Sequence, residues 1–200
     1  SIRRQRQMCI RDRNRAFSRE IAAKTFVLLK NEGNLLPLQR KGKIALIGPL
    51  ADNSKNMSGT WSVAARLDDN KTILGSMKKA LKGKAEVLYA KGSNLMYDAK
   101  READATMFGR EMRDSRSNEE MLKEALNVAQ QADIIVAAVG ESSEMSGECS
   151  SRTNLEMPDA QKDLLIALKK TGKPIVLVNF SGRATAVSYT HLTLPTNREV

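Results

Sequence analysis

The stretch Asp133-Ile-Ile-Val-Ala-Ala-Val-Gly140, followed by Glu141-Ser-Ser-Glu-Met-Ser-Gly-Glu148-Cys-Ser-Ser-Arg152, decides the fold. An uninterrupted apolar run of this length is typical of a parallel strand that is buried on both faces. In open α/β sheets, ligands bind in the loops that follow the carboxyl ends of such strands. Three glutamates lie within the first eight residues of this loop, and carboxylates in that place favour acid/base chemistry. The stretch therefore predicts an α/β fold with a candidate catalytic loop at residues 141–152.

The rest of the chain alternates between strand and helix patterns. Apolar runs predict three further strands, at residues 43–49, 85–90 and 173–179. Amphipathic patterns predict helices at residues 18–30, 73–81 and 121–131, and from Pro158 to a stop at Gly172. Ser117 and Glu120 form a capping-box pattern before the third of these helices, and residues 93–116 read as an irregular excursion. The order predicts a mostly parallel sheet with helices on both faces, an α/β sandwich that is truncated after about four strands.

Both ends of the chain look foreign. Met8-Cys-Ile-Arg-Asp-Arg13 is one translation of a transposase end sequence used to prepare DNA libraries, and Val187-Ser-Tyr-Thr-His-Leu192 translates its complementary strand. We therefore expect residues 1–13 and 187–200 to be translated adapter, and residues 14–186 to come from a natural gene. The two end segments carry net charges of +4 and 0, so the natural part carries +6 of the chain's +10.

This division excludes several kinds of chemistry. His191 and Cys9 fall in the end segments, so the natural part has no histidine and only Cys149. It therefore has no Ser-His-Asp or Cys-His triad, no histidine metal site and no internal disulfide. Residues 48–52 follow a strand but lack the glycine spacing of a nucleotide-binding loop, and we expect no cofactor. No aromatic-interleaved basic patch or membrane-length apolar run occurs, so we expect neither a nucleic acid nor a membrane as partner.

Glu148 is the sharpest candidate for a catalytic residue. It lies between Gly147 and Cys149, where a glutamate is either a general acid or an ordinary solvated loop acid. The residues alone do not decide which of Glu141, Glu144 and Glu148 is used. Arg152 is suited to anchor the loop on a carboxylate, and Cys149 reads as a passive neighbour.

Two residues outside this loop are weaker candidates. Asp52 follows the first strand, where it either contacts a ligand or serves ordinary turn chemistry. Trp61 either stacks on a sugar ring or covers the edge of the sheet, and the packing interpretation is favoured.

A set of short motifs resembles one known family. The motifs are Val27-Leu-Leu-Lys-Asn31, Leu35-Leu-Pro-Leu38, Ile47-Gly-Pro-Leu-Ala-Asp52, Gly59-Thr-Trp-Ser62, Tyr89-Ala-Lys-Gly92, Ala138-Val-Gly-Glu141, Ser150-Ser-Arg-Thr153 and Gly172-Lys-Pro-Ile-Val-Leu-Val178. Together they are similar to the second domain of family 3 glycoside hydrolases, above all to the bacterial periplasmic β-glucosidases. The resemblance covers essentially all of residues 14–186.

The resemblance implies a function shared between two domains. In this family a (β/α)8 barrel carries an aspartate nucleophile, and the following α/β sandwich supplies the acid/base glutamate of a retaining mechanism. Many members have Glu-Gly-x-Asp-Arg at this place. Glu148 and Arg152 match that pattern, whereas Cys149 and Ser151 depart from it. The resemblance thus implies that Glu148 is the acid/base and that Glu141 and Glu144 are supporting or spectator acids. We expect Arg152 and Glu141 to bind substrate.

The resulting expectation is a fragment of a retaining β-glucosidase-type, exo-acting glycoside hydrolase. Its expected partners are β-linked glucosides or oligosaccharides and the missing N-terminal barrel, its location is periplasmic or secreted, and the fragment alone is expected to be inactive. The alternative is a non-catalytic carbohydrate-binding or scaffolding α/β module whose acids are merely solvated. A basic nucleic-acid binder is a third reading that rests on net charge alone.

Overall fold

The computed structural model describes residues 2–56, 58–59, 61–62, 66–105, 113–148 and 150–185. Its backbone divides into two units, residues 1–38 and 39–200. The first unit contains helix α1 (Ile2–Thr25) and the short turn η1 (Glu32–Asn34). Between them, the side chain of Asn31 forms two hydrogen bonds of 2.9 Å with the backbone N–H and C=O of Leu36.

The predicted helix at residues 18–30 was wrong in both bounds. Helix α1 runs straight through Ser18, because the arginine-rich sequence before it favours helix as strongly as the sequence that follows. It ends at Thr25, whose hydroxyl donates to the carbonyl of Ala22, and the aromatic and β-branched pair Phe26-Val27 follows outside the helix. The predicted adapter boundary after residue 13 falls inside α1, and residues 187–200 lie outside the described residues.

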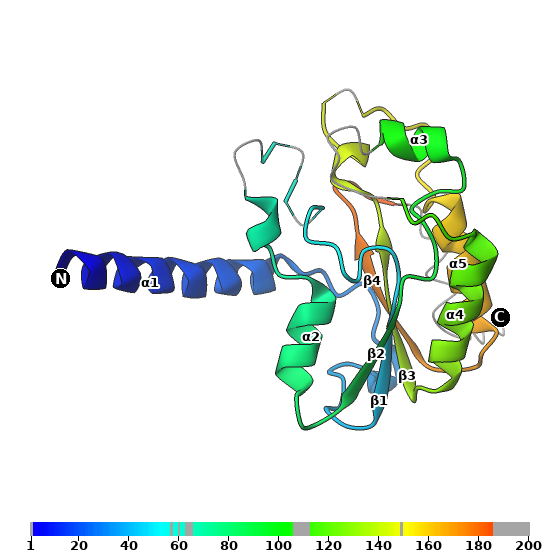
Figure 1. The fold of residues 1–200 in the computed structure, drawn as a ribbon, viewed down its shortest axis with the longest axis horizontal. Coiled ribbons are helices and arrows are strands. Elements are labelled where there is room, and N and C mark those ends of the chain that lie inside the picture. Colours follow the sequence, from blue (N-terminus) through cyan, green and yellow to red (C-terminus); the bar gives the residue numbers. More distant parts are fainter. Residues whose placement is uncertain are drawn as a thin grey trace. The chain divides into compact units, whose positions relative to one another are not determined.

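The second unit is built on one parallel sheet (Figure 1). Its strands are β1 (Lys43–Ile47), β2 (Glu86–Ala90), β3 (Ile134–Gly140) and β4 (Ile175–Phe180), in the spatial order β2-β1-β3-β4. Helix α2 (Ile73–Leu81) lies on one face, and helices α4 (Asn118–Gln130) and α5 (Asp159–Lys169) lie on the other. The predicted parallel α/β sandwich with helices on both faces is therefore confirmed.

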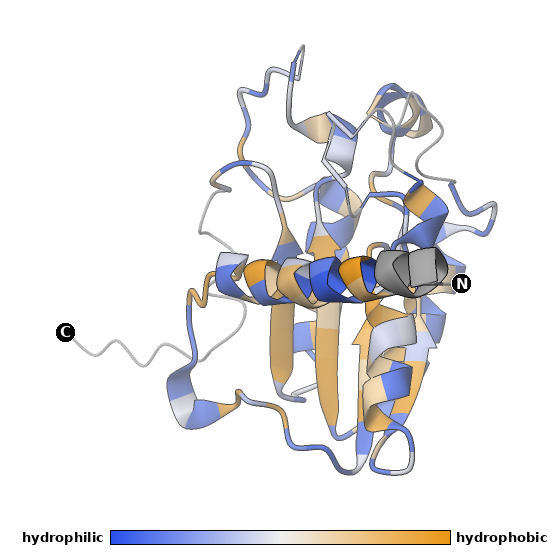
Figure 2. Cartoon of the chain, turned by 90° about the vertical axis from the view of Figure 1, so that its left-hand side faces the viewer, coloured by the Kyte–Doolittle hydropathy of each residue, from blue (hydrophilic) through white to orange (hydrophobic). Residues whose placement is uncertain are grey.

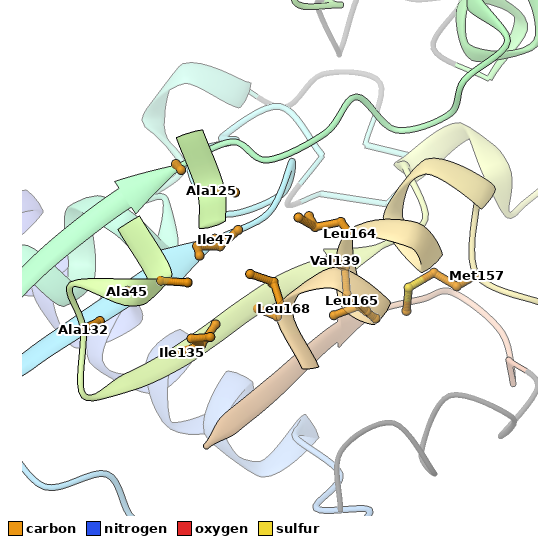
Figure 3. Close-up of a cluster of buried hydrophobic side chains, with 13 residues drawn as sticks. Ala45, Ile47, Ala125, Ala132, Ile135, Val139, Met157, Leu164, Leu165 and Leu168 are labelled. Carbon is orange, nitrogen blue, oxygen red and sulfur yellow. The ribbon is translucent and has the colours of Figure 1, made fainter. Parts of the chain in front are cut away.

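The core follows from the apolar runs of the sequence. Figure 2 shows the strands in hydrophobic colours, and β3 is buried along nearly its whole length. On the α4 and α5 face, alanines of the strands meet Ala125 and Ala129 of α4, which allows close approach, while the leucines of α5 fill the remaining space (Figure 3). Each fully buried leucine contributes about 2 kcal/mol to stability. The two central strands are thus fixed by apolar contacts on both faces.

The helix ends show where sequence signals worked and where they failed. Ser117 and Glu120 form the predicted capping box at the start of α4. Pro158 lies at the N-cap of α5 and not in its first turn. The excursion at residues 93–116 contains the short helix α3 (Ala99–Asp104), which begins where the Asp98 carboxylate accepts from the N–H groups of Lys100 and Arg101. That helix has too few residues to show a hydrophobic period.

The strand order reverses between β1 and β3. The chain passes from β1 outward to β2, then returns across the sheet to β3 and continues to β4. The loops that follow β1 and β3 therefore leave the sheet in opposite directions, and such a point is where open α/β sheets bind ligands. In the described part of the chain, no helix is both long enough and apolar enough to cross a membrane.

Candidate active site

The acidic loop begins at a point where two backbones approach closely. Gly140 ends β3 with φ of 134°, and a Cβ there would lie 2.0 Å from the carbonyl oxygen of Phe180 in β4. The next N–H, that of Glu141, donates to the same carbonyl at 2.8 Å. Only glycine fits this geometry, so the direction in which the loop leaves the sheet is fixed by β4.

A buried glutamine fixes the same point from the helix side. Gln161 of α5 is fully buried, and its Oε1 accepts from the N–H of Gly140 at 2.7 Å. Its Nε2 donates to the carbonyls of Gly140 at 2.9 Å and Leu95 at 3.1 Å. Two of its hydrogen bonds thus hold Gly140 at the root of the loop, and the third holds the segment after β2.

Glu141 is an internal ion-pair partner of the loop. Its side chain is only 2% exposed, and Oε1 accepts from Nη1 of Arg152 at 2.5 Å. Its Oε2 accepts from the hydroxyl of Ser181 at 3.1 Å and lies 3.5 Å from Nε of Arg183. Arg152 also donates to the carbonyl of Glu156 at 3.0 Å. The expected anchoring of the loop by Arg152 on a carboxylate is what the structure shows.

The first turn of the loop is bound to neighbouring segments. Ser143 donates through both its N–H and its hydroxyl to Oδ1 of Asn56, at 2.9 and 3.1 Å. Asn56 belongs to the loop after β1, so this contact joins the two loops that flank the reversal of strand order. The hydroxyl of Ser142 donates to the carbonyl of Ala105 at 2.9 Å, and the turn η3 (Ser143–Met145) is buried.

Glu148 has the opposite environment. It is exposed, and among the described residues no side chain or N–H binds its carboxylate. Glu141 and Glu144 are both buried, so Glu148 is the glutamate of this loop that faces solvent. A carboxylate that must reach a bond in a separate substrate has to be accessible in this way. Cys149, beside it, lies outside the described residues.

The two candidates from the loop after β1 are also on the surface. Asp52 is exposed. Trp61 is 70% exposed, so the interpretation that it covers the sheet edge was wrong. The stacking alternative for Trp61 stays open. Among the residues that the structure describes, no group of three histidine, cysteine, aspartate or glutamate side chains is placed to hold a metal ion.

Three residues that support the loop from elsewhere in the chain were not predicted. Arg183 and Ser181 follow β4, and Gln161 lies in α5. One signal was available: the carboxyl ends of neighbouring parallel strands meet at one edge, so the segment after β4 had to lie beside the segment after β3. That β3 and β4 are neighbours is a tertiary fact, which local patterns do not contain.

Comparisons with known proteins identify the family of the chain. A family model for the glycosyl hydrolase family 3 C-terminal domain matches residues 26–195. A periplasmic beta-glucosidase of Salmonella typhimurium is 43% identical over 175 residues, which cover 87% of this chain and 23% of that protein. A beta-xylosidase of Formosa agariphila is 30% identical over 190 residues, which cover 92% of this chain and 24% of that protein.

A solved structure shares the fold. The beta-glucosidase from Listeria innocua in complex with glucose superposes with a TM-score of 0.61 at 29% identity, over 84% of this chain and 20% of that one. The chain thus spans about a quarter of the length of the curated relatives it matches. Because the family model covers most of the chain, and the same parallel sheet recurs in the solved relative, the chain belongs to glycosyl hydrolase family 3, where it corresponds to the C-terminal domain.

Proposed function

We propose that this domain supplies the general acid/base of a retaining, exo-acting glycoside hydrolase of the β-glucosidase type. The observation that carries the proposal is the contrast within one loop: Glu148 is exposed, while the rest of the loop is held by buried bonds at the carboxyl edge of β3. The named activities of the relatives, beta-glucosidase and beta-xylosidase, support the reaction class.

The mechanism divides the work between two carboxyl groups. Glu148 protonates the glycosidic oxygen while an aspartate of the N-terminal barrel attacks the anomeric carbon and forms a glycosyl-enzyme. The leaving alcohol departs, and the Glu148 carboxylate then removes a proton from the water that hydrolyses this intermediate. Retention requires the two carboxyl groups to lie about 5 Å apart, so the loop must present Glu148 to the barrel in one fixed pose.

Arg152 and Glu141 are proposed to act on the substrate side of the same loop. Their side chains bind each other, and Arg152 keeps one-fifth of its side chain exposed, whereas Glu141 does not reach solvent. A guanidinium held by a buried carboxylate has donors left for sugar hydroxyls. In this proposal Arg152 makes the contact and Glu141 sets its orientation.

The proposed substrates are β-linked glucosides or oligosaccharides, with β-xylosides as the comparison, since relatives carry both names. A periplasmic or secreted location is proposed by analogy with the periplasmic relative. The assignment of residues 1–13 and 187–200 to translated adapter stays a prediction; the family match begins at residue 26 and extends to residue 195.

The test is Glu148→Gln in the intact hydrolase that contains this domain. We expect kcat/KM on aryl β-glucosides with poor leaving groups to fall by about 100-fold or more, because protonation of the leaving oxygen is lost. Dinitrophenyl glucoside needs no proton, so its glycosyl-enzyme still forms, and in the shorter variant Glu148→Ala, which leaves room for azide, azide should release β-glucosyl azide from it. Glu119→Gln, a change at another exposed glutamate, is the control and should leave both rates unchanged. Normal rates for Glu148→Gln would favour the non-catalytic module.

A further inference from the structure

Arg183 lies beside the acidic loop although 31 residues separate it from Arg152. It belongs to the segment Ser181-Gly182-Arg183 that follows β4, and β4 pairs with β3 up to the register Gly140 with Phe180. The two segments therefore leave the sheet side by side. Its side chain is 22% exposed, and its backbone N–H donates to the hydroxyl of Ser181 at 3.2 Å.

The guanidinium of Arg183 binds the acidic loop on both sides of Glu148. Its Nη2 donates to the carbonyl of Met145 and to the carbonyl of Ser150, the latter at 3.0 Å. Met145 precedes Glu148 by three residues and Ser150 follows it by two. One nitrogen atom therefore joins the two ends of the short segment that carries the exposed glutamate.

The backbone beside Arg183 independently shows how close the two segments lie. A Cβ on Gly182 would lie 2.1 Å from the hydroxyl oxygen of Ser146 and 2.8 Å from its Cβ. No larger residue fits there without moving the loop. The segment after β4 is thus packed directly against the residue that follows Met145.

Glu141 completes the arrangement because its one carboxylate lies beside both arginines. Its carboxylate, bonded to Arg152, also lies 3.5 Å from Nε of Arg183. A guanidinium is planar and presents its donors in a fixed fork, so a carboxylate at one side and two carbonyls at the other leave it little freedom. The same contacts leave the segment between Met145 and Ser150 little freedom.

We propose that Arg183 is a positioning residue, which holds the segment between Met145 and Ser150 in the one pose that delivers Glu148 to the glycosidic oxygen. This inference rests on the proposed acid/base role of Glu148. It adds that the pose depends on a residue after β4 as well as on bonds within the acidic loop, such as the one from the Ser150 hydroxyl to the carbonyl of Glu144 at 2.7 Å. Because a displacement of about 1 Å costs about 100-fold in a step that depends on orientation, loss of the bridge should be visible in the proton-transfer step alone.

Arg113 provides a matched control within the chain. It too pairs with a buried glutamate, Glu102, at 2.7 Å, and donates to two backbone carbonyls, those of Met96 and Tyr97, both at 2.9 Å. Its partners lie in residues 96–102, between β2 and α4, whereas those of Arg183 lie in the acidic loop. Arg113→Ala therefore removes the same kinds of bonds from another segment.

The first measurement is hydrogen exchange on the 200-residue chain. The N–H groups of Met145 and Ser150 are bonded to the carbonyls of Ser142 and Gly147. We expect Arg183→Ala to speed their exchange by about tenfold or more, Arg183→Lys to have an intermediate effect, and Arg113→Ala to have none. Unchanged exchange in Arg183→Ala would overturn the inference. If Arg183→Ala does not fold, Arg183→Lys carries the test, because lysine keeps the charge but cannot bind both carbonyls and Glu141 together.

The second measurement is the ratio of kcat/KM for phenyl and dinitrophenyl β-glucosides in the intact hydrolase. We expect Arg183→Ala to lower this ratio by about 100-fold, as Glu148→Gln does, and Arg113→Ala to leave it unchanged. If Glu148→Gln lowers the ratio and Arg183→Ala does not, the positioning role is wrong and the acid/base proposal stands. If Glu148→Gln itself leaves the ratio unchanged, the proposed function fails, whatever the exchange data show.

Discussion

Glu141 and Glu148 lie seven residues apart in one loop, yet their side chains have opposite environments. Glu141 directly follows Gly140 at the end of β3, and its buried side chain lies beside Arg152 and Arg183. Glu148 lies after the buried turn η3 and points outward. The sequence therefore shows that the loop contains carboxylates, but the environment of each carboxylate depends on its position relative to the sheet.

The buried ion pair can be tested by Glu141→Gln. The glutamine amide carries no charge to offset the guanidinium groups of Arg152 and Arg183. Removing one partner of a buried ion pair costs about 3 kcal/mol or more of folding free energy. We expect the urea midpoint of the chain to fall accordingly, with the slope of the transition unchanged.

Glu156→Gln is the matched change in an exposed pair. Glu156 binds Lys162 at 3.0 Å, and both side chains are 43% exposed. Water already solvates this pair, so its loss should cost less than about 1 kcal/mol. Equal losses for the two variants would show that the carboxylate of Glu141 is not buried as described.

The candidate site was predictable to the extent that it is local. The loop at residues 141–152 was found from a strand pattern followed by acids, and the pairing of Arg152 with a carboxylate was anticipated. Gln161, Asn56 and Arg183 were not, because each reaches the loop from another element. Their contacts depend on which strands are neighbours, which no local pattern encodes.

At the scale of elements, the strands and helices α2 and α4 were the most predictable parts: α2 has the predicted bounds, and α4 begins three residues before the predicted Met121. Each strand is an apolar run bounded by glycine, proline or polar residues, and α4 has both a hydrophobic period and a capping box. Helix α3 was missed because its six residues are held by Asp98 and by tertiary bonds of Glu102 and not by a period. Helix α1 was mis-bounded because arginine-rich sequence extends a helix without marking where it begins.

The capping box makes a prediction about pH. The backbone N–H of Ser117 donates to the Glu120 carboxylate, and so does its hydroxyl. These bonds, the backbone one most of all, hold the pKa of Glu120 below its usual value. A lowered pKa in the folded state means that this carboxylate stabilises the fold above its unfolded pKa of about 4.3, and that the contribution is lost as the pH falls through the folded value. We therefore expect Glu120→Gln to be less stable than the parent chain at pH 7, with a difference that shrinks below about pH 4.

Urea unfolding at pH 7 and pH 3 measures this directly. Glu119→Gln is the control, because it removes an acid from the same first turn without touching a bond to Ser117. The difference in unfolding free energy between Glu119→Gln and the parent chain should change less with pH. If Glu120→Gln lowers the free energy of unfolding by the same amount at both pH values, the capping bond does not depend on the charge of the Glu120 carboxylate.

At the scale of the whole molecule, the loops after three strands meet at one edge of the sheet. Asn56 follows β1, residues 141–152 follow β3, and Arg183 follows β4, and each is bonded to the next. Within residues 141–152, the carboxylates of Glu141 and Glu144 are buried and that of Glu148 is exposed. An edge whose loops are bonded to one another, and whose acidic loop exposes Glu148, is suited to complete a site on another domain.

This arrangement predicts that the 200-residue chain alone does not hydrolyse aryl β-glucosides. A retaining mechanism needs a second carboxyl group about 5 Å from the acid/base, and the neighbours of Glu148 in the loop, Glu141 and Glu144, are buried and cannot attack a sugar in solvent. The purified chain should therefore show no release of phenol above the rate of buffer. The matched sample is the chain with Glu148→Gln, which should be indistinguishable from it. Turnover by the parent chain that Glu148→Gln abolishes would mean that the nucleophile lies within these residues, and the division of the active site between two domains would have to be given up.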